Sequence, residues 1–242
     1  MKKRIALFLL IVLNITVWYG GKISLEKIGS GEKIQKIEVN QTGAVRNKIR
    51  EHPKVAITFD DGPSTVYTEI LLDGLKERGV RATFFLTGRE IQYSKNVVKR
   101  MSDEGHIVGN HTYSHIDLKR TDYAKAKEEI EKTNECIKKV TGKTPKYIRP
   151  PYGDWDDRLL EETDMSIVLW SVDPEDWKDQ NAEIVARRVI KSTKPGDVIL
   201  LHDIFKTSVE AALIIVDELQ NEGYEFVTID KIDSAKVINK NQ

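Results

Sequence analysis

The feature that most constrains the fold is a regular alternation of strand-like and helix-like segments that begins at residue 55. The strand-like segments are short apolar runs rich in β-branched and aromatic residues: 55–59, 82–86, 106–109, 147–149, 166–172, 197–201 and 226–229. The helix-like segments between them are 65–78, 91–103, 123–140, 158–163, 182–193 and 207–222. This alternation is typical of an α/β fold with a parallel sheet and helical crossovers. Seven such strands favour a (β/α) barrel over an open sheet, although the pattern does not decide closure.

Polar side chains stand out immediately after these strands. They are Asp60 and Asp61, His111 and His115, Arg149, Asp173 and Asp176, and His202. In (β/α) barrels the carboxyl ends of the strands share one face, and active sites lie on that face. We therefore expect these residues to converge on one site although they are far apart in the sequence.

The first strand ends in two adjacent carboxylates, in the stretch V-A-I-T-F-D-D-G-P at 55–63. Two neighbouring negative charges repel each other, and a bound cation or an arginine relieves the repulsion. His111 and His115 are spaced i, i+4, so both imidazoles would share a face on a helical turn. Two histidines and a carboxylate supply three ligands for a divalent ion and leave positions open for water and substrate. The combination predicts a metal site.

Each of these residues also has a simpler structural interpretation. Asp60 or Asp61 is suited to cap the helix that follows, and both histidines are suited to the surface. Arg149 would then pair with an acidic neighbour, and Trp177 would belong to the core. The choice between the two interpretations depends on whether the residues converge in space.

Composition excludes several classes of function and site. The 242 residues carry a formal net charge of zero, so no general attraction to nucleic acid is expected. The single cysteine, Cys136, excludes an internal disulfide and a metal site built from cysteines. Met1-Lys-Lys-Arg precedes an apolar run at 5–19, which is the pattern of an export signal and is short for a membrane span. We expect export, with cleavage or a retained anchor, and a buried N-terminal helix is the alternative.

Five motifs occur in order along the chain: T-F-D-D-G-P at 58–63, H-T-Y-S-H at 111–115, R-P-P-Y-G at 149–153, D-P-E-D-W at 173–177 and L-L-H at 200–202. Together they resemble the polysaccharide deacetylase family, the NodB-homology domain of carbohydrate esterase family four. The resemblance implies a distorted (β/α) barrel with about seven parallel strands. The domains expected from it are a signal peptide or signal anchor at 1–21, a stem at 22–52, the catalytic domain at 53–232 and a polar tail at 233–242.

The resemblance also implies a role for each motif residue. Asp61, His111 and His115 would hold a divalent metal, with zinc expected and cobalt, nickel and manganese as alternatives. Asp60 would be the general base, Arg149 would hold it, His202 would be the general acid, and Asp176 would hydrogen-bond His202. The backbone N–H of Tyr152 would bind the oxyanion, and Trp177, Leu200 and Tyr152 would bind substrate.

The function implied is removal of N-acetyl groups from N-acetylglucosamine-type residues of a cell-wall polysaccharide, with peptidoglycan as the first choice. One alternative is an O-acetyl esterase acting on xylan-like or chitin-like glycans. Another is a catalytically silent cell-wall or sporulation protein, whose signature would be loss of a metal ligand or of the base; the sequence retains all of them. The expected partner is the polysaccharide, on the extracytoplasmic side, with a membrane anchor if the signal is retained, and the sequence leaves the oligomeric state open.

Overall fold

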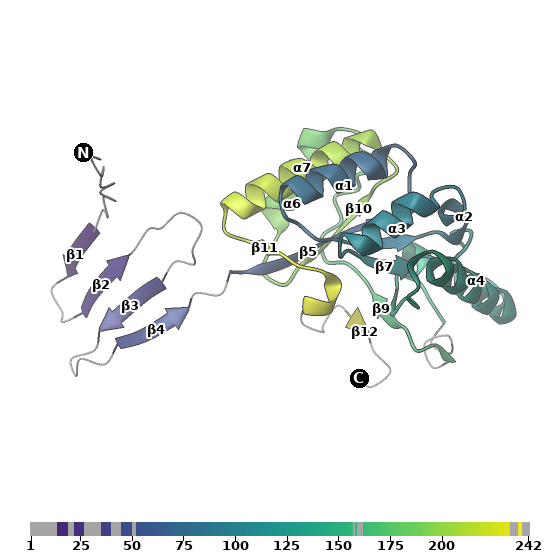
Figure 1. Ribbon diagram of the computed structural model, residues 1–242, viewed down its shortest axis with the longest axis horizontal. Coiled ribbons are helices and arrows are strands. Elements are labelled where there is room, and N and C mark those ends of the chain that lie inside the picture. Colours follow the sequence, from purple (N-terminus) through teal and green to yellow (C-terminus); the bar gives the residue numbers. More distant parts are fainter. Residues whose placement is uncertain are drawn as a thin grey trace, which may run out of the picture. The chain divides into compact units, whose positions relative to one another are not determined.

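The structure is a computed structural model that describes residues 52–156, 158, 162–232 and 237–238, together with four N-terminal strands (Figure 1). The chain divides into two compact units, Met1–His52 and Pro53–Gln242. In the first unit, β1 (Asn14–Trp18), β2 (Lys22–Glu26), β3 (Gln35–Val39) and β4 (Val45–Ile49) form an antiparallel sheet in sequence order. The predicted signal segment, 1–21, lies outside the described residues except for β1.

The second unit is built on a curled parallel sheet. Its strands are β5 (Lys54–Asp60), β6 (Thr83–Leu86), β7 (Ile107–Asn110), β8 (Tyr147–Ile148), β9 (Ser166–Val168), β10 (Val198–His202), β11 (Glu225–Phe226) and β12 (Val237–Ile238). The order is β10-β5-β6-β7-β8-β9-β12, and β11 also pairs with β5. All strand pairs of this sheet are parallel except β9 with β12, which is antiparallel. The strand β12 lies within the predicted polar tail at 233–242.

The sheet curls so far that the segment after β9 reaches β10 at the other edge. The predicted strand 166–172 pairs with β8 only at its beginning, and Val172 then pairs with Ile199 of β10. The backbone N–H groups of Ser171 and Val172 both donate to the carbonyl of Val198. One segment therefore contacts both sides of the sheet, which confirms the predicted α/β fold with a distorted barrel.

Helices cover the outer face of this sheet. They are α1 (Tyr67–Glu77), α2 (Gly88–Ile91), α3 (Lys95–Asp103), α4 (Tyr123–Thr141), α6 (Ala182–Ser192) and α7 (Lys206–Asn221), with 3-10 turns at Pro151–Gly153 and Ile229–Lys231. Figure 1 shows α1, α6 and α7 together beside β10 and β5. Among the described residues, no helix is both long and apolar enough to cross a bilayer.

Two helix predictions need comment. The predicted helix 91–103 is broken, because Ser94 has a non-helical backbone (φ −132°, ψ 37°) and begins α3 as a separate helix. The predicted helix 158–163 falls partly outside the described residues.

Alternation along β5 explains how the sheet supports a polar site. Val55, Ile57 and Phe59 belong to the main core formed with the helices, whereas Ala56 belongs to a second cluster inside the curl of the sheet. Because side chains alternate between faces with a period of two, Thr58 and Asp60 share the inner side with Ala56. The strand therefore delivers Asp60 to the inside of the curl, with Asp61 directly after it.

Candidate active site

The predicted residues converge at the carboxyl end of the sheet. A pocket of about 430 Å³ is lined by Asp60, Asp61, His111, His115, Pro150, Tyr152, Trp170, Asp173, Trp177, Leu200, His202 and Phe205. The other two predicted residues, Arg149 and Asp176, are buried and contact Asp60 and His202 respectively. The structure thus brings together every residue that the sequence singled out for the site.

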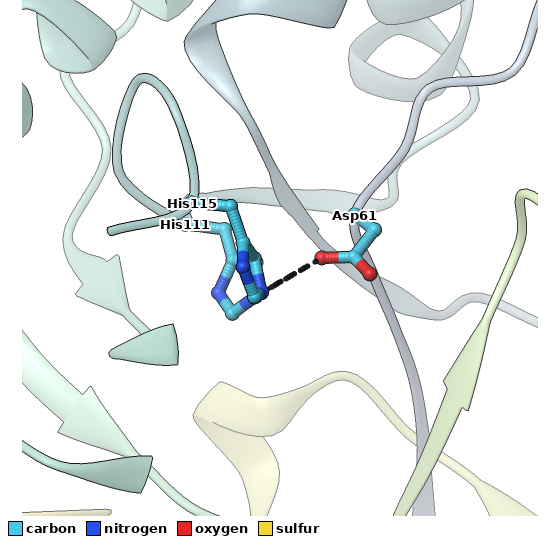
Figure 2. A group of neighbouring side chains, drawn as sticks. All are labelled: Asp61, His111 and His115. Atoms are coloured by element: carbon cyan, nitrogen blue, oxygen red, sulfur yellow. Dashed lines mark ion pairs between the residues drawn. The ribbon is translucent and has the colours of Figure 1, made fainter. Parts of the chain in front are cut away.

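Asp61, His111 and His115 form a compact cluster of ligand atoms, all within 4.8 Å of one another. Figure 2 shows both imidazoles facing the carboxylate of Asp61. Asp61 Oδ1 lies 3.4 Å from His111 Nε2 and 3.2 Å from His115 Nε2. Two ligands of a tetrahedral zinc ion, each about 2.0 Å from it, stand about 3.3 Å apart. The spacing of the cluster therefore fits a tetrahedral ion.

The hydrogen bonding of the cluster also fits a cation. His111 Nδ1 lies 2.6 Å from the carbonyl oxygen of Arg149, which can only accept, so Nδ1 carries the proton. In the neutral ring, Nε2 then presents a lone pair to Asp61 Oδ1. That oxygen is buried and has no hydrogen-bond partner among the described residues. A buried acceptor facing another lone pair is costly unless a cation lies between them.

Electrostatics favour the metal-binding forms of Asp61 and His115. Burial acts to raise the pKa of Asp61, but His111, His115 and His202 outweigh it and hold the pKa below its ordinary value. Burial lowers the pKa of His115, and the nearby charge of Asp61 only partly opposes this. An ionised carboxylate and neutral imidazoles are the forms that coordinate a metal ion.

The histidine pair lies on a loop and not on a helical turn. Thr112 (φ 62°) and His115 (φ 58°) have left-handed backbones, which interrupt a helix. Asn110 Oδ1 accepts the N–H of Thr112 at 2.7 Å, and the carboxylate of Glu129 accepts the N–H of Ser114 at 2.7 Å. These side chains hold the loop in a shape that turns both imidazoles toward Asp61.

Asp60 is held by a buried arginine. Arg149 is 0% exposed, and its Nη1 donates to Asp60 Oδ1 at 2.8 Å and to Thr58 Oγ1 at 2.7 Å. Its Nε donates to the carbonyl of Val168 at 3.1 Å, and its guanidinium stacks on the ring of Phe85. Asp60 Oδ2 remains on the side of the ligand cluster, 3.8 Å from His111 Nε2. The contact fixes one carboxylate oxygen and leaves the other facing the pocket.

His202 and Asp176 form a second pair across the pocket. His202 Nδ1–H donates to Asp176 Oδ1 at 2.8 Å, and the backbone N–H of His202 donates to Asp176 Oδ2 at 2.8 Å. Burial acts to lower the pKa of His202, but the hydrogen bond and charge of Asp176, with Asp60 and Asp61 nearby, raise it to about 9. His202 is therefore an imidazolium at neutral pH, suited to donate a proton.

The walls of the pocket are apolar and aromatic. Trp177 is 52% exposed, so its alternative interpretation as a core residue was wrong. Tyr152 is 68% exposed, and its ring centroid lies 5.1 Å from that of His115. Leu200 is buried on the pocket side of β10. These side chains can contact a small apolar group beside the ligand cluster.

Left-handed backbones mark this end of the sheet. Within the described residues, the non-glycine residues with positive φ are Asp61, Thr112, His115, Tyr152 and Glu175. Each belongs to the site or is adjacent to one of its residues. Such conformations cluster where a fold imposes a particular geometry on functional groups.

Sequence reasoning missed residues that support the site from outside it. Glu129, which holds the loop of the histidines, lies on the buried face of α4, and a carboxylate on that mostly apolar face was the available signal. Thr68 and Asp203 are also fully buried beside the site. Nothing in the local pattern of the sequence marks these two.

Comparisons with known proteins place the chain among polysaccharide deacetylases. Residues 47–166 match the family described as polysaccharide deacetylase. The chain is 42% identical over 182 residues to the peptidoglycan-N-acetylmuramic acid deacetylase PdaC of Bacillus subtilis, which covers 75% of this chain and 39% of PdaC. It is 40% identical over 190 residues to the peptidoglycan-N-acetylglucosamine deacetylase PgdA of Listeria monocytogenes. That alignment covers 78% of this chain and 41% of PgdA. The chain thus spans about two fifths of these relatives.

Solved structures share the fold. The structure of PdaC from Bacillus subtilis has a TM-score of 0.74 at 41% identity and covers 75% of this chain and 90% of that chain. A second match is a family 4 acetyl xylan esterase from Clostridium thermocellum, solved in complex with a cobalt ion. Its TM-score is 0.70 at 35% identity, and the match covers 74% of this chain and 89% of the esterase chain.

Proposed function

The chain belongs to the polysaccharide deacetylase family, and on that premise we propose that it is a metal-dependent hydrolase that removes N-acetyl groups from N-acetylglucosamine-type residues of peptidoglycan. The observation that carries the proposal is the ligand cluster of Asp61, His111 and His115, with Asp60 on one side and the imidazolium of His202 nearby. A base, an acid and a cation site around one small pocket are the parts that amide hydrolysis requires.

Zinc is the ion we propose for the cluster, with cobalt, nickel and manganese as alternatives. Two imidazoles and one carboxylate are a common ligand set for catalytic zinc. The acetyl xylan esterase that shares the fold was solved in complex with a cobalt ion, which supports a divalent ion as the cofactor. When bound, a divalent ion supplies Lewis acidity toward the acetyl carbonyl and makes water more acidic.

The side chains then divide the proton transfers between them. The oxygen of a water molecule bonds to the acetyl carbon, and Asp60, held by Arg149, takes the proton that this water loses. The backbone N–H of Tyr152 donates to the carbonyl oxygen as negative charge develops on it. His202, oriented by Asp176, gives a proton to the amide nitrogen while the C–N bond breaks. Acetate and a free amine leave, with Leu200 and Trp177 beside the methyl group.

A second candidate is an O-acetyl esterase on xylan-like glycans, because the acetyl xylan esterase shares the fold. The pocket is suited to an acetyl group in either linkage. The imidazolium of His202 favours the amide, because an amine leaves poorly unless it is protonated.

We also propose that the chain acts outside the cytoplasm, with residues 53–232 as its catalytic domain. PdaC and PgdA are named as peptidoglycan deacetylases, and the N-terminal pattern at 1–21 supports export, either by a cleaved signal or by a retained anchor. The names of these two relatives differ in the sugar, so the position of the acetyl group is part of the proposal.

The test is acetate release by the full chain with zinc, from peptidoglycan and from acetylated xylan, followed by mass spectrometry of the digested glycan. We expect acetate from peptidoglycan and deacetylated glucosamine in its fragments. Deacetylation of muramic acid alone would overturn the proposed sugar. Acetate from xylan alone would establish the esterase instead.

A further inference from the structure

Asp203 is a buried carboxyl group that none of the proposed chemical steps uses. It follows His202 directly, is 0% exposed and accepts a hydrogen bond from the hydroxyl of Thr68 on its Oδ2. Its Oδ1 is buried and has no hydrogen-bond partner among the described residues. Burying a carboxyl oxygen without a hydrogen-bond partner costs free energy. The contacts of Asp203 must therefore account for its presence here.

Thr68 connects Asp203 to the turn that carries Asp61. The hydroxyl of Thr68 accepts the backbone N–H of Ser64 at 2.8 Å. A hydroxyl has one proton, and here that proton is directed to Asp203. The hydrogen bonds therefore run from Ser64 through Thr68, on the first turn of α1, to Asp203 at the end of β10.

Gly62 lies directly against the same carboxyl group. A Cβ at this position would stand 2.3 Å from Asp203 Oδ1 and 2.6 Å from Oδ2. Gly62 is not among the glycines with positive φ, so its backbone conformation does not require glycine. The close approach of Asp203 does require it.

Thr87, directly after β6, also contacts the turn. The backbone N–H of Thr87 donates to the carbonyl of Gly62 at 3.1 Å. Asp61 itself has a left-handed backbone (φ 72°), which persists only where neighbouring groups fix it. Asp203, Thr68 and Thr87 are thus among the groups in contact with this turn.

We infer that Asp203 and Thr68 are positioning residues that set the place of the Asp61 carboxylate and thereby the affinity of the metal site. The inference rests on the proposed function only in taking Asp61 as a metal ligand. Groups that orient metal ligands typically contribute 10- to 100-fold to metal affinity.

The test is calorimetric titration of the metal-free full chain with Zn²⁺, for the wild type and for Thr68→Val. Valine keeps the shape of threonine but removes the donor to Asp203 and the acceptor for Ser64. We expect zinc affinity to fall by about 10- to 100-fold in Thr68→Val and to return in Thr68→Ser, which keeps the hydroxyl. Gly62→Ala, whose methyl group would displace Asp203 or the turn, should also weaken zinc binding.

Gly74→Ala is the matched control for general strain. Gly74 also lacks a left-handed backbone and is also crowded, here by Leu213 at 2.5 Å, but it lies in the helix layer. We expect this variant to lower the melting temperature without changing zinc affinity. Wild-type zinc affinity in both Thr68→Val and Gly62→Ala would overturn the inference. Failure of the wild type to bind zinc would instead overturn the proposed metal site itself.

Discussion

The helix layer and the carboxyl end of the sheet both contain an arginine that binds carboxylates, in very different surroundings. Arg100 of α3 contacts Glu69 at 2.6 Å, Asp73 at 2.6 Å and Glu104 at 3.0 Å, near solvent. Arg149 contacts Asp60 at 2.8 Å with both side chains buried. Water screens the first network, whereas the second leaves an uncompensated charge if either partner is removed. We therefore expect substitution of Arg100 to be tolerated and substitution of Arg149 to be costly.

The largest effect is expected from Arg149→Met. The substitution leaves the buried carboxylate of Asp60 without its partner, so the free energy of unfolding should fall by about 3–5 kcal/mol. Urea denaturation of the metal-free full chain measures this. A loss below about 1 kcal/mol would mean that the buried pair behaves like a surface pair.

The next largest effect is expected from Asp176→Asn, and it concerns activity and not the free energy of unfolding. The pKa of His202, about 9, depends on Asp176, so in the wild type the imidazolium is present below about pH 9 and activity should fall as pH rises through that value. Without the carboxylate, the pKa of His202 should fall and the alkaline limb should move to lower pH. We expect kcat at pH 8 to fall by about 10²-fold, in line with loss of a general acid.

The pH profile of kcat for both proteins is the measurement. An alkaline limb at the same pH in the wild type and in Asp176→Asn would show that this pair does not set the protonation of the acid.

The smallest effect is expected from Arg100→Met in the helix layer. Its three carboxylate partners are partly exposed, so the free energy of unfolding should change by about 0.2–1 kcal/mol, with kcat unchanged. The same denaturation and acetate assays check it beside Arg149→Met. A loss as large as that of Arg149→Met would remove the contrast between the two regions.

Much of the fold and the site could be predicted because the relevant signals are local. The alternation from residue 55 reports strands and helices, and the convergence of Asp61, His111 and His202 follows from the rule that parallel strands end on one face. The conformation of the loop that carries the histidines could not be predicted, because an i, i+4 spacing does not reveal left-handed residues such as Thr112.

The supporting contacts could not be predicted, because they join residues that only folding brings together. Thr68 and Asp203 are separated by 135 positions, and each looks ordinary in its own segment. The pairing of Val172 with β10 depends likewise on the curl of the whole sheet. Local patterns specify the elements and the reactive groups, whereas the contacts that hold those groups depend on tertiary packing.

The central claim is that Asp61, His111 and His115 hold a metal ion, while Asp60 accepts the proton of the attacking water. The most direct measurement is zinc content and acetate release for the full chain, for His111→Ala and for Asp60→Asn. We predict about one zinc ion per chain in the wild type and in Asp60→Asn, with acetate release at least about 10²-fold slower in Asp60→Asn, and no bound zinc in His111→Ala. Zinc retained by His111→Ala, or wild-type acetate release by Asp60→Asn, would contradict the account.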